Sequence, residues 1–397
     1  MSGELDEGGP LAGVVVIDLS RALAGPHASM MLADLGARVI KVENAAGGDD
    51  TRSWGPPFVG PDAASDRIST YFLSANRNKE SVVLDLKSAP DMEVLVALLE
   101  KADVLVENFR PGVLDRLGLP ASHLSRLNPK LITLSISGFG HDGPEGARGG
   151  YDQIAQGEAG IMSVTGPDPS QPTKVGVPIG DVAAGMYGAF GVVAALFDRE
   201  KTGRGGIVRT SLLAALVGMH AFQGTAWTVG RQLPVAQGPH HPSICPYGLF
   251  SARDGVVQIA VGSEGLWKRF AAEFGIDPDA EGFATNADRV RNGDEVRATV
   301  NALFSEFDTD TLLSRLDAAG VPSGKVRDFE QVYDWDQTRS QGLLIEVEHP
   351  VLGTIELPGP AVRFFGATGV HEWRREHTAP PALGQDDSAV RAWARDG

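Results

Sequence analysis

The sequence predicts an α/β fold with a doubly wound parallel sheet and a second, smaller α+β domain. Over the first third of the chain, short apolar runs alternate with segments of helical periodicity. A strand inside a parallel sheet is buried on both faces, so its sequence is nearly continuous in apolar residues. Beyond residue 230 the alternation stops, which indicates that a differently built domain begins there.

The first segments predict a compact βαβ unit. We expect a strand at 13–20 (GVVVIDLS), a helix at 25–37 and a second strand at 38–44. Pro26 suits the start of this helix and Gly36 suits its end, because proline fits the first helical turn and glycine tolerates the turn that stops it.

The same alternation continues along the chain. We expect a strand at 81–87, a helix at 90–101, and further strands at 103–109 and 130–137. The apolar residues of the helix recur every three or four positions, as one buried helical face requires. Repeated βα units of this kind predict a Rossmann-like parallel sheet.

The second domain follows a linker at 230–248 that is rich in proline and glycine. Residues 247–262 predict an antiparallel hairpin that turns at Asp254-Gly255, and helical segments continue to about 320. A further hairpin at 342–364 is expected to return to the large domain. The predicted parts are 11–225 for the first part of the large, ligand-binding domain, 226–325 for the small domain with its linkers, and 326–397 for the return.

Composition restricts the possible partners. The 397 residues carry a formal net charge of −16, which argues against nucleic acid because a nucleic-acid binder needs a basic face. A few local Arg and Lys residues can still hold a small anionic ligand. Cys245 is the single cysteine, so we expect no intrachain disulfide and no cysteine-based metal site.

Two segments bear on location. The opening MSGELDEGGPLAG lacks the basic and apolar regions of a signal peptide. The uncharged run from Val182 to Phe197 is shorter than a usual membrane span and rich in glycine and alanine. We therefore expect a buried helix in a cytoplasmic protein, with no membrane partner.

Ligands of open α/β sheets bind beyond the carboxyl ends of the strands. Those ends carry Ser20-Arg21, Glu43-Asn44, Asn108-Phe109-Arg110 and Ser137-Gly138. No G-x-G-x-x-G follows the first strand, and the sequence holds neither a Walker motif nor a G-x-S-x-G elbow. A dinucleotide, a P-loop nucleotide and a serine hydrolase are therefore disfavoured.

One carboxylate is set in an apolar stretch. In VGVPIGDVAAGMYGAFGVVAALF (175–197), Asp181 precedes a run that predicts a helix. Asp181 suits a helix N-cap, where aspartate is favoured. It also suits a nucleophile, because helix-terminal N–H groups would keep it ionised while partial desolvation makes its oxygen reactive. Both interpretations remain open on the residues alone.

Several stretches together resemble one family, the family III CoA-transferases (CaiB–BaiF type). The matching segments are DLSRALAGPHASMMLADLGARVIKVE, GGDDTRSWGPPF, NRNKESVVLDLK, VENFRPGVLDRLGL, YDQIAQGEAGIMSVTG, VGVPIGDVAAGMYG, KTGRGG and the tail PALGQDD. They span most of the chain from residue 11 to 390. Within the family, GGDDTRSWGPPFVG and EHPVLGTIELPGPAVRF are most similar to the succinyl-CoA:glutarate enzymes.

The resemblance implies a mechanism. The family's catalytic aspartate falls on Asp181, whose carboxylate attacks an acyl-CoA thioester to give a mixed anhydride. CoA then attacks the enzyme carbonyl, an aspartyl-CoA thioester forms, and the acceptor acid reverses the steps. The chemistry implies acyl-CoA and a free carboxylic acid as substrates, coenzyme A as cosubstrate, and neither a metal nor a tightly bound cofactor.

The resemblance also implies individual site residues. Its CoA-binding positions fall on Ala24, Leu84, Lys87, Asn108, Phe109 and Arg116, and an active-site tyrosine falls on Tyr151. Lys87 and Arg116 suit CoA phosphates, and Phe109 suits adenine. By residue type alone, a solvated surface is favoured for the first two and the core for Phe109.

The sequence departs from formyl-CoA transferase, a member of the family, at two places. Leu23 stands where that enzyme has an active glutamine, and GPHHPSICPYG replaces its glycine-rich loop. We therefore expect another acyl pair, short dicarboxylates of four to six carbons. The distal carboxylate needs a cationic partner, for which the candidates are Arg52 first, then Arg21, His240 and His241.

The resemblance implies a homodimer of interlocked chains. Two alternative functions remain. An α-methylacyl-CoA racemase uses a histidine where this chain has Tyr151, and a tyrosine is poorly matched to abstracting an α-proton at neutral pH. A non-catalytic CoA-binding protein would not need Asp181.

Overall fold

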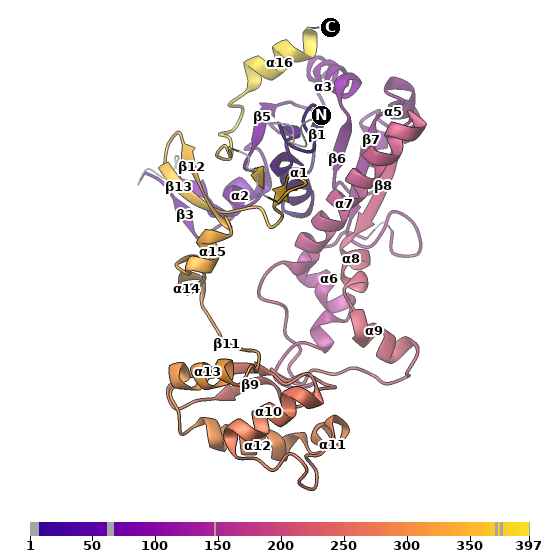
Figure 1. The fold of residues 1–397 in the computed structure, drawn as a ribbon. Coiled ribbons are helices and arrows are strands. Elements are labelled where there is room, and N and C mark those ends of the chain that lie inside the picture. The colour runs from indigo at the N-terminus through magenta and orange to yellow at the C-terminus, as the bar shows by residue number, and fades with distance from the viewer. Residues whose placement is uncertain (1–7, 62–66, 147, 370–371, 374–375, 397) are drawn as a thin grey trace. The chain divides into compact units, whose positions relative to one another are not determined.

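The computed structural model describes residues 8–61, 67–146, 148–369, 372–373 and 376–396 (Figure 1). The chain divides into two units. Unit 1 comprises Met1–Ile161, Val175–Gly230 and Asp336–Gly397, and unit 2 comprises Met162–Lys174 and Arg231–Trp335. The sequence placed the boundaries at 225/226 and 325/326, and it did not predict that 162–174 joins the smaller unit.

Unit 1 is built on a parallel sheet of six strands, which confirms the predicted fold class (Figure 1). The strand order is β5-β2-β1-β6-β7-β8, and every neighbouring pair is parallel. The strands are β1 (Val15–Asp18), β2 (Arg38–Glu43), β5 (Lys79–Val83), β6 (Val104–Glu107), β7 (Ile132–Ser137) and β8 (Gly206–Ser211). The chain runs outward from β1 through β2 to β5, and outward the other way from β6 to β8. The strand order therefore reverses between β1 and β6.

Side-chain alternation along the strands separates two cores. Val16 of β1 packs with α1 and α7 on one face, whereas its neighbour Ile17 packs with α3 on the other. The reason is the two-residue period of a strand, which sends successive side chains to opposite faces. The first face is covered by α1 (Ala24–Asp34), α6 (Asp152–Glu158), α7 (Ile179–Thr202) and α8 (Leu212–Gly218), and the second by α3 (Ala89–Lys101), α5 (Ala121–Leu127) and α16 (Asp387–Arg395).

Strand β8 was absent from the sequence prediction. It forms the edge next to β7, and most of its residues are exposed or half-buried. An edge strand of this kind has no continuous apolar run, so its sequence lacked the signal used for the other strands. At the opposite edge, Asp386 and Asp387 of the tail accept hydrogen bonds from the backbone N–H groups of Ser81 and Val83, at 2.8 and 2.7 Å. The tail thereby covers an edge that would otherwise be open.

Helix α7 packs closely against α1. A side chain at Gly185 would bring its Cβ within 2.8 Å of the Ala24 carbonyl oxygen and 3.0 Å of the His27 ring, so only glycine fits there. By length and composition α7 could cross a membrane, and 44% of its apolar window is buried inside the chain. The predicted helix is present, and it begins three residues earlier than the uncharged run.

The remaining elements of unit 1 are short. A hairpin of β12 (Leu344–His349) and β13 (Gly353–Pro358) matches the predicted hairpin, and its Val347 and Leu357 pack on Leu73. The others are η1 (Asp50–Ser53), β3 (Phe58–Val59), β4 (Ile68–Ser69), α2 (Thr70–Leu73), α4 (Val113–Arg116), α9 (Ala221–Thr228), α15 (Asp336–Ser340), β14 (Phe364–Phe365) and β15 (Glu372–Trp373); η2 (Ile161–Ser163) spans the boundary.

Unit 2 has its own core. Strands β9 (Tyr247–Ser251) and β10 (Val256–Ala260) form the predicted antiparallel hairpin, and β11 (Ser323–Lys325) pairs with β10. Phe250 of β9 packs edge-to-face on Phe304, which also contacts Phe270. The helices are α10 (Glu264–Phe274), α11 (Asn286–Arg291), α12 (Gly293–Phe304), α13 (Thr309–Ala318) and α14 (Phe329–Tyr333).

Candidate active site

The loops after β1 and β6 meet where the strand order reverses. The backbone N–H of Arg21 donates to Asn108 Oδ1 at 2.8 Å, and Asn108 Nδ2 donates to the Arg21 carbonyl at 2.6 Å. In open parallel sheets, ligands bind at this reversal beyond the carboxyl ends of the strands. Asn108 was predicted to bind CoA, and in the structure its side chain joins the two loops.

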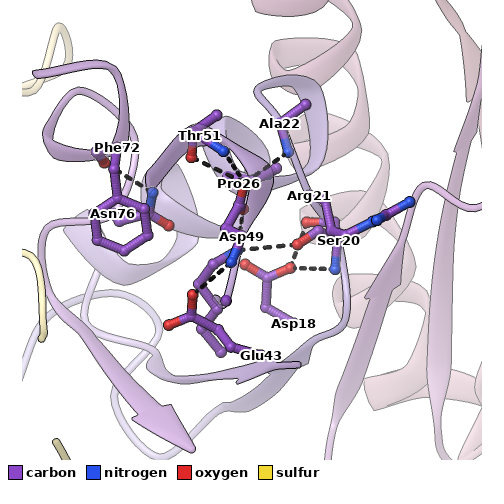
Figure 2. A network of polar contacts seen from close by, with 12 residues as sticks. Asp18, Ser20, Arg21, Ala22, Pro26, Glu43, Asp49, Thr51, Phe72 and Asn76 are labelled. Carbon is purple, nitrogen blue, oxygen red and sulfur yellow. Dashed lines mark hydrogen bonds and ion pairs between the residues drawn. The ribbon is translucent and has the colours of Figure 1, made fainter. Parts of the chain in front are cut away.

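A fully buried carboxylate anchors the first of these loops (Figure 2). Asp18 accepts hydrogen bonds from the Ser20 backbone at 2.9 Å, from the Ser20 hydroxyl, and from Ser29 Oγ at 2.6 Å. Lys79 Nζ lies 3.1 Å from Asp18 Oδ2. Burial alone would raise the pKa of Asp18, but Lys79 and Lys41 outweigh it and lower the pKa to about 2. Asp18 therefore stays ionised and holds the loop.

A second carboxylate, Asp49, fixes the turn of the same loop (Figure 2). Its Oδ2 pairs with Lys41 Nζ at 2.8 Å, and both side chains are buried. Its Oδ1 accepts the backbone N–H of Thr51 at 3.0 Å and of Ala22 at 3.2 Å. Ala22 has a φ of 63°, a left-handed conformation that a non-glycine residue adopts only when its surroundings impose it. Asp49 is one of the groups that impose it.

Arg52, the first-choice partner for a substrate carboxylate, is engaged within the chain. Its Nε and one terminal nitrogen donate to the two carboxylate oxygens of Glu43, at 2.8 and 2.6 Å. The guanidinium also lies over the Phe72 ring, 3.7 Å from its centroid. Glu43 therefore occupies the Nε edge of the guanidinium in a bidentate pair, and Arg52 also donates to the Pro381 carbonyl at 3.1 Å.

A cavity of about 430 Å³ opens at the reversal of strand order. Three of the six predicted CoA residues line it, namely Leu84, Lys87 and Phe109. Arg21 lines it as well, with a guanidinium nitrogen 3.3 Å from Asp50. The cavity is also lined by Ser20, Lys41, Glu43 and Asp49, which belong to the ion pairs and loops described above.

Asn108, already described, and two further predicted CoA residues lie outside this lining. Ala24 is buried as the first residue of α1, with its carbonyl facing α7 at Gly185. Arg116 ends the short helix α4, and its neighbour Leu117 lines the cavity.

Asp181 is the third residue of α7 rather than its N-cap, a position that Pro178 occupies. The N-cap interpretation was therefore wrong. The N–H groups that would have bonded to Asp181 donate instead to Asp152 Oδ1, at 2.7 Å from Gly180 and 3.3 Å from Asp181 itself. The reason is that α6 brings the Asp152 carboxylate to the end of α7.

The environment of Asp181 favours its protonated form. Burial, and after it the negative charge of Asp152, raise the pKa of Asp181 to about 7. The expectation that the helix end keeps this carboxylate ionised was wrong, because a second carboxylate takes up the helix-terminal donors. No cation among the described residues offsets this shift, and a strongly shifted carboxyl of that kind is typical of a reactive site rather than of a structural ion pair.

Tyr71 and Trp54 were not among the predicted site residues. Burial raises the pKa of Tyr71 to about 12, and the charges of Asp181, Asp152 and Asp49 add to this effect. Tyr71 therefore lies within electrostatic reach of both Asp181 and the cavity residue Asp49. Its ring meets Trp54 edge-on at 5.1 Å between centroids. Trp54 stands inside a stretch that carried the family resemblance, which was the available signal.

The remaining predicted residues lie as follows. Tyr151 is the N-cap residue of α6, directly before Asp152, and its side chain is 71% exposed. His240 and His241 belong to unit 2, where their rings contact Phe250 and Tyr247. Among the residues that the structure describes, no group of three or more His, Cys, Asp or Glu side chains is arranged to hold a metal ion.

Known proteins match the chain over most of its length. The family model "CoA-transferase family III" matches residues 11–387. The succinyl-CoA:glutarate CoA-transferase of Homo sapiens is 37% identical over 96% of this chain and 85% of its own. The succinate–glutarate CoA-transferase of Agrobacterium fabrum is 39% identical over 85% of each. A CaiB/BaiF family protein from Brucella suis has a similar crystal structure, with a TM-score of 0.85, 35% identity, and coverage of 97% of this chain and 99% of that one.

The raised pKa of Asp181 predicts how Asp181→Asn changes stability with pH. Between an unfolded pKa near 3.8 and a folded pKa of about 7, the unfolded carboxyl is ionised and the folded one is not, so the wild type loses stability as pH rises through this range. Asparagine cannot ionise and avoids this loss. Relative to the wild type, the variant should gain roughly 2–3 kcal/mol between pH 5 and pH 8.5.

Urea unfolding at the two pH values measures this difference. Asp198→Asn, on the exposed surface of the same helix, is the matched control. A difference between wild type and Asp181→Asn that stays constant across the range would contradict the raised pKa.

Proposed function

The chain belongs to CoA-transferase family III, and from that premise we propose that Asp181 accepts and passes on coenzyme A between an acyl-CoA thioester and a free dicarboxylic acid. The observation that carries the proposal is the Asp181 carboxyl itself. It is half-buried, no cation among the described residues lowers its pKa, and that pKa is about 7. Such an oxygen is poorly hydrated, and a poorly hydrated carboxylate is a stronger nucleophile once ionised.

The proposed reaction has two halves. The Asp181 oxygen attacks the thioester carbonyl, the C–S bond breaks, and CoA leaves as a thiolate while a mixed anhydride forms. The thiolate then attacks the Asp181 carbonyl carbon, which releases the donor acid and leaves an aspartyl-CoA thioester. The acceptor carboxylate attacks that thioester to form a new anhydride and thiolate. The thiolate attacks the acceptor's acyl carbon, which regenerates the Asp181 carboxylate and releases the new acyl-CoA.

We place coenzyme A in the cavity at the reversal of strand order. Lys87 lines it and offers a cationic group for phosphate oxygens, and Phe109 offers a ring for adenine. Asp49, which lines the cavity, and Asp181 both raise the pKa of Tyr71. Tyr71 therefore lies within electrostatic reach of both the cavity and the nucleophile. The thioester end of a molecule in the cavity would then lie toward Asp181.

We propose dicarboxylates as the acids because the two curated relatives named above are glutarate transferases. The distal carboxylate of such an acid needs a donor of its own. Arg52 is held by Glu43, so we assign it to supporting the loop after β2. Of the other candidates, Arg21 lines the cavity of unit 1, and we propose it for the distal carboxylate.

Covalent trapping tests the nucleophile. Incubation with succinyl-CoA, without an acceptor acid, followed by hydroxylamine and peptide mass spectrometry should place the adduct on Asp181. Asp181→Ala should form none and should lose transfer activity by several orders of magnitude, because no covalent intermediate can form. Asp198→Asn serves as the control variant. An adduct on another residue, or transfer retained by Asp181→Ala, would overturn the assignment.

A specificity ratio tests the acid. With succinyl-CoA as donor, kcat/KM for glutarate should exceed that for butyrate at least tenfold, or roughly 1.4 kcal/mol, because the charged partner of the distal carboxylate would be left unpaired. Butyrate is glutarate without that carboxylate. Equal rates with the two acids would refute the dicarboxylate assignment and leave the Asp181 chemistry unaffected.

We also propose that the protein is a homodimer. Met186, Phe190, Val193 and Phe197 form an exposed apolar stripe along α7, with Phe190 72% exposed. A stripe of this size on one face marks an interaction surface, and the family resemblance implies a second copy as its partner.

Light scattering should give twice the chain mass of 41.9 kDa, and Phe190→Lys should shift the protein toward monomer because it places a charge in the interface. Val256→Lys, at an exposed apolar residue of β10, is the control. A monomeric wild type that binds lipid vesicles would instead assign the stripe to a membrane.

A further inference from the structure

Two carboxylates meet at the start of α7. Asp152 Oδ1 accepts the backbone N–H of Gly180 at 2.7 Å and that of Asp181 at 3.3 Å. The approach is close, because a Cβ at Gly180 would lie 3.0 Å from the same oxygen. Asp152 therefore bonds to the backbone of the residue proposed as the nucleophile.

Asp152 is itself held in place by Gln156, one turn later in α6. Gln156 is fully buried, and its Nε2 donates to Asp152 Oδ2 at 2.7 Å. Gln156 Oε1 accepts the backbone N–H of Val175 at 2.8 Å. The pair thus clamps both ends of segment 175–181, which leads into α7.

The clamp has a chemical consequence for Asp181. The first N–H groups of a helix lack partners within the helix and attract a nearby carboxylate. Without Asp152, the Asp181 carboxylate, which lies in the first turn of the same helix, could turn back to them. With Asp152 bonded there, the Asp181 oxygens are left for substrate.

Resting on the proposed role of Asp181 as nucleophile, we propose that Asp152, locked by Gln156, is a positioning residue that holds the first turn of α7 and faces Asp181 with a fixed negative charge. Asp152 thereby keeps the Asp181 carboxylate away from the N–H groups at the start of α7. Its negative charge also raises the proton affinity of the Asp181 oxygens. Both effects act through backbone contacts and charge, and neither requires Asp152 to touch substrate.

Other groups near Asp181 stay neutral in the physiological range. From α1, His27 lies against Gly185, one turn beyond Asp181, and burial lowers its pKa to about 4. From α2, Tyr71 has a pKa of about 12.

The residues of β7 and α8 that pack on α7 carry no ionisable side chain. On β8, Val208 faces α7, so its neighbour Arg209 lies on the opposite face of the sheet and acts on Glu107. Asp152 is therefore the charge whose removal should change the titration of Asp181 between pH 5 and 9.

Two substitutions separate charge from positioning. Asp152→Asn keeps a side-chain oxygen for the N–H groups of α7 and removes the charge. It should move the acid limb of the kcat/KM profile for succinyl-CoA to lower pH by about one unit or more. Asp152→Ala removes the acceptor as well, and should lower kcat a further tenfold or more while KM for succinyl-CoA changes little.

Hydrogen exchange gives a readout independent of activity. The amides of segment 175–186 should exchange faster in Asp152→Ala than in Asp152→Asn or the wild type, because only alanine removes the acceptor. Glu158→Gln is the matched control at the end of the same helix, where Glu158 pairs with Arg148 at the surface. It should leave the pH profile, kcat and the exchange of this segment unchanged.

The outcomes distinguish the two proposals. If the wild type forms the Asp181 adduct but neither Asp152 variant changes the pH profile, kcat or exchange, the positioning role is overturned and the proposed function stands. If the wild type forms no adduct at Asp181, the proposed function fails and the positioning role falls with it. Should Asp152→Ala fail to fold, an unshifted acid limb in Asp152→Asn is enough to overturn the inference.

Discussion

The buried ion pair between Asp18 and Lys79 is the contact on which the ligand-binding end of the sheet depends. A charge inside a protein is tolerated only when it is paired and hydrogen-bonded, and removing one partner costs about 3–5 kcal/mol. Asp18 meets this requirement with the lysine and two serines, and Lys79 meets it with Asp18, the Pro26 carbonyl and Asn76. Because both charges need these partners, β1, β5 and the start of α1 are held close together around the ion pair. The loop after β1 has its shape because these groups must be satisfied.

The same physics gives opposite results for two aspartates of this chain. Asp18 is buried beside cations, and its pKa falls to about 2. Asp181 is buried beside Asp152, and its pKa rises to about 7. The first carboxylate is fixed in its charged form and serves the structure. The second exchanges its proton near neutrality, as a group that attacks and is later released requires.

Ion pairs between β2 and the loop that follows it hold the backbone next to the cavity. Glu43 and Arg52 form a bidentate ion pair. Lys41 forms an ion pair with Asp49 and also donates a hydrogen bond to the Ser20 carbonyl. These pairs use up functional groups that look available when only the sequence is read. Their effect is to hold backbone, such as the left-handed turn at Ala22, in a conformation that would not persist alone.

Local patterns were enough to predict much of this protein. Five of the six parallel strands overlap segments predicted from their apolar residues, with β5 beginning two residues earlier than predicted. Helices α1, α3 and α7 have the periodicity and end residues of helices, so these signals lie within a few neighbouring residues. Family motifs pointed to Asp181 and to the cavity residues Leu84, Lys87 and Phe109. Strand β8 was missed because an edge strand needs no continuous apolar run.

The partners of charged groups were decided by packing between distant segments. Asp152 reaches the end of α7 across 28 residues, and Lys79 reaches Asp18 across 61. Which oxygen caps a helix, and whether an arginine is free for substrate, depends on what the fold brings next to it. Only the tertiary structure could show that Asp152, rather than Asp181, accepts the N–H groups at the start of α7. The reason is that the interaction energy of two charged groups depends on their distance in space and not on their separation along the chain.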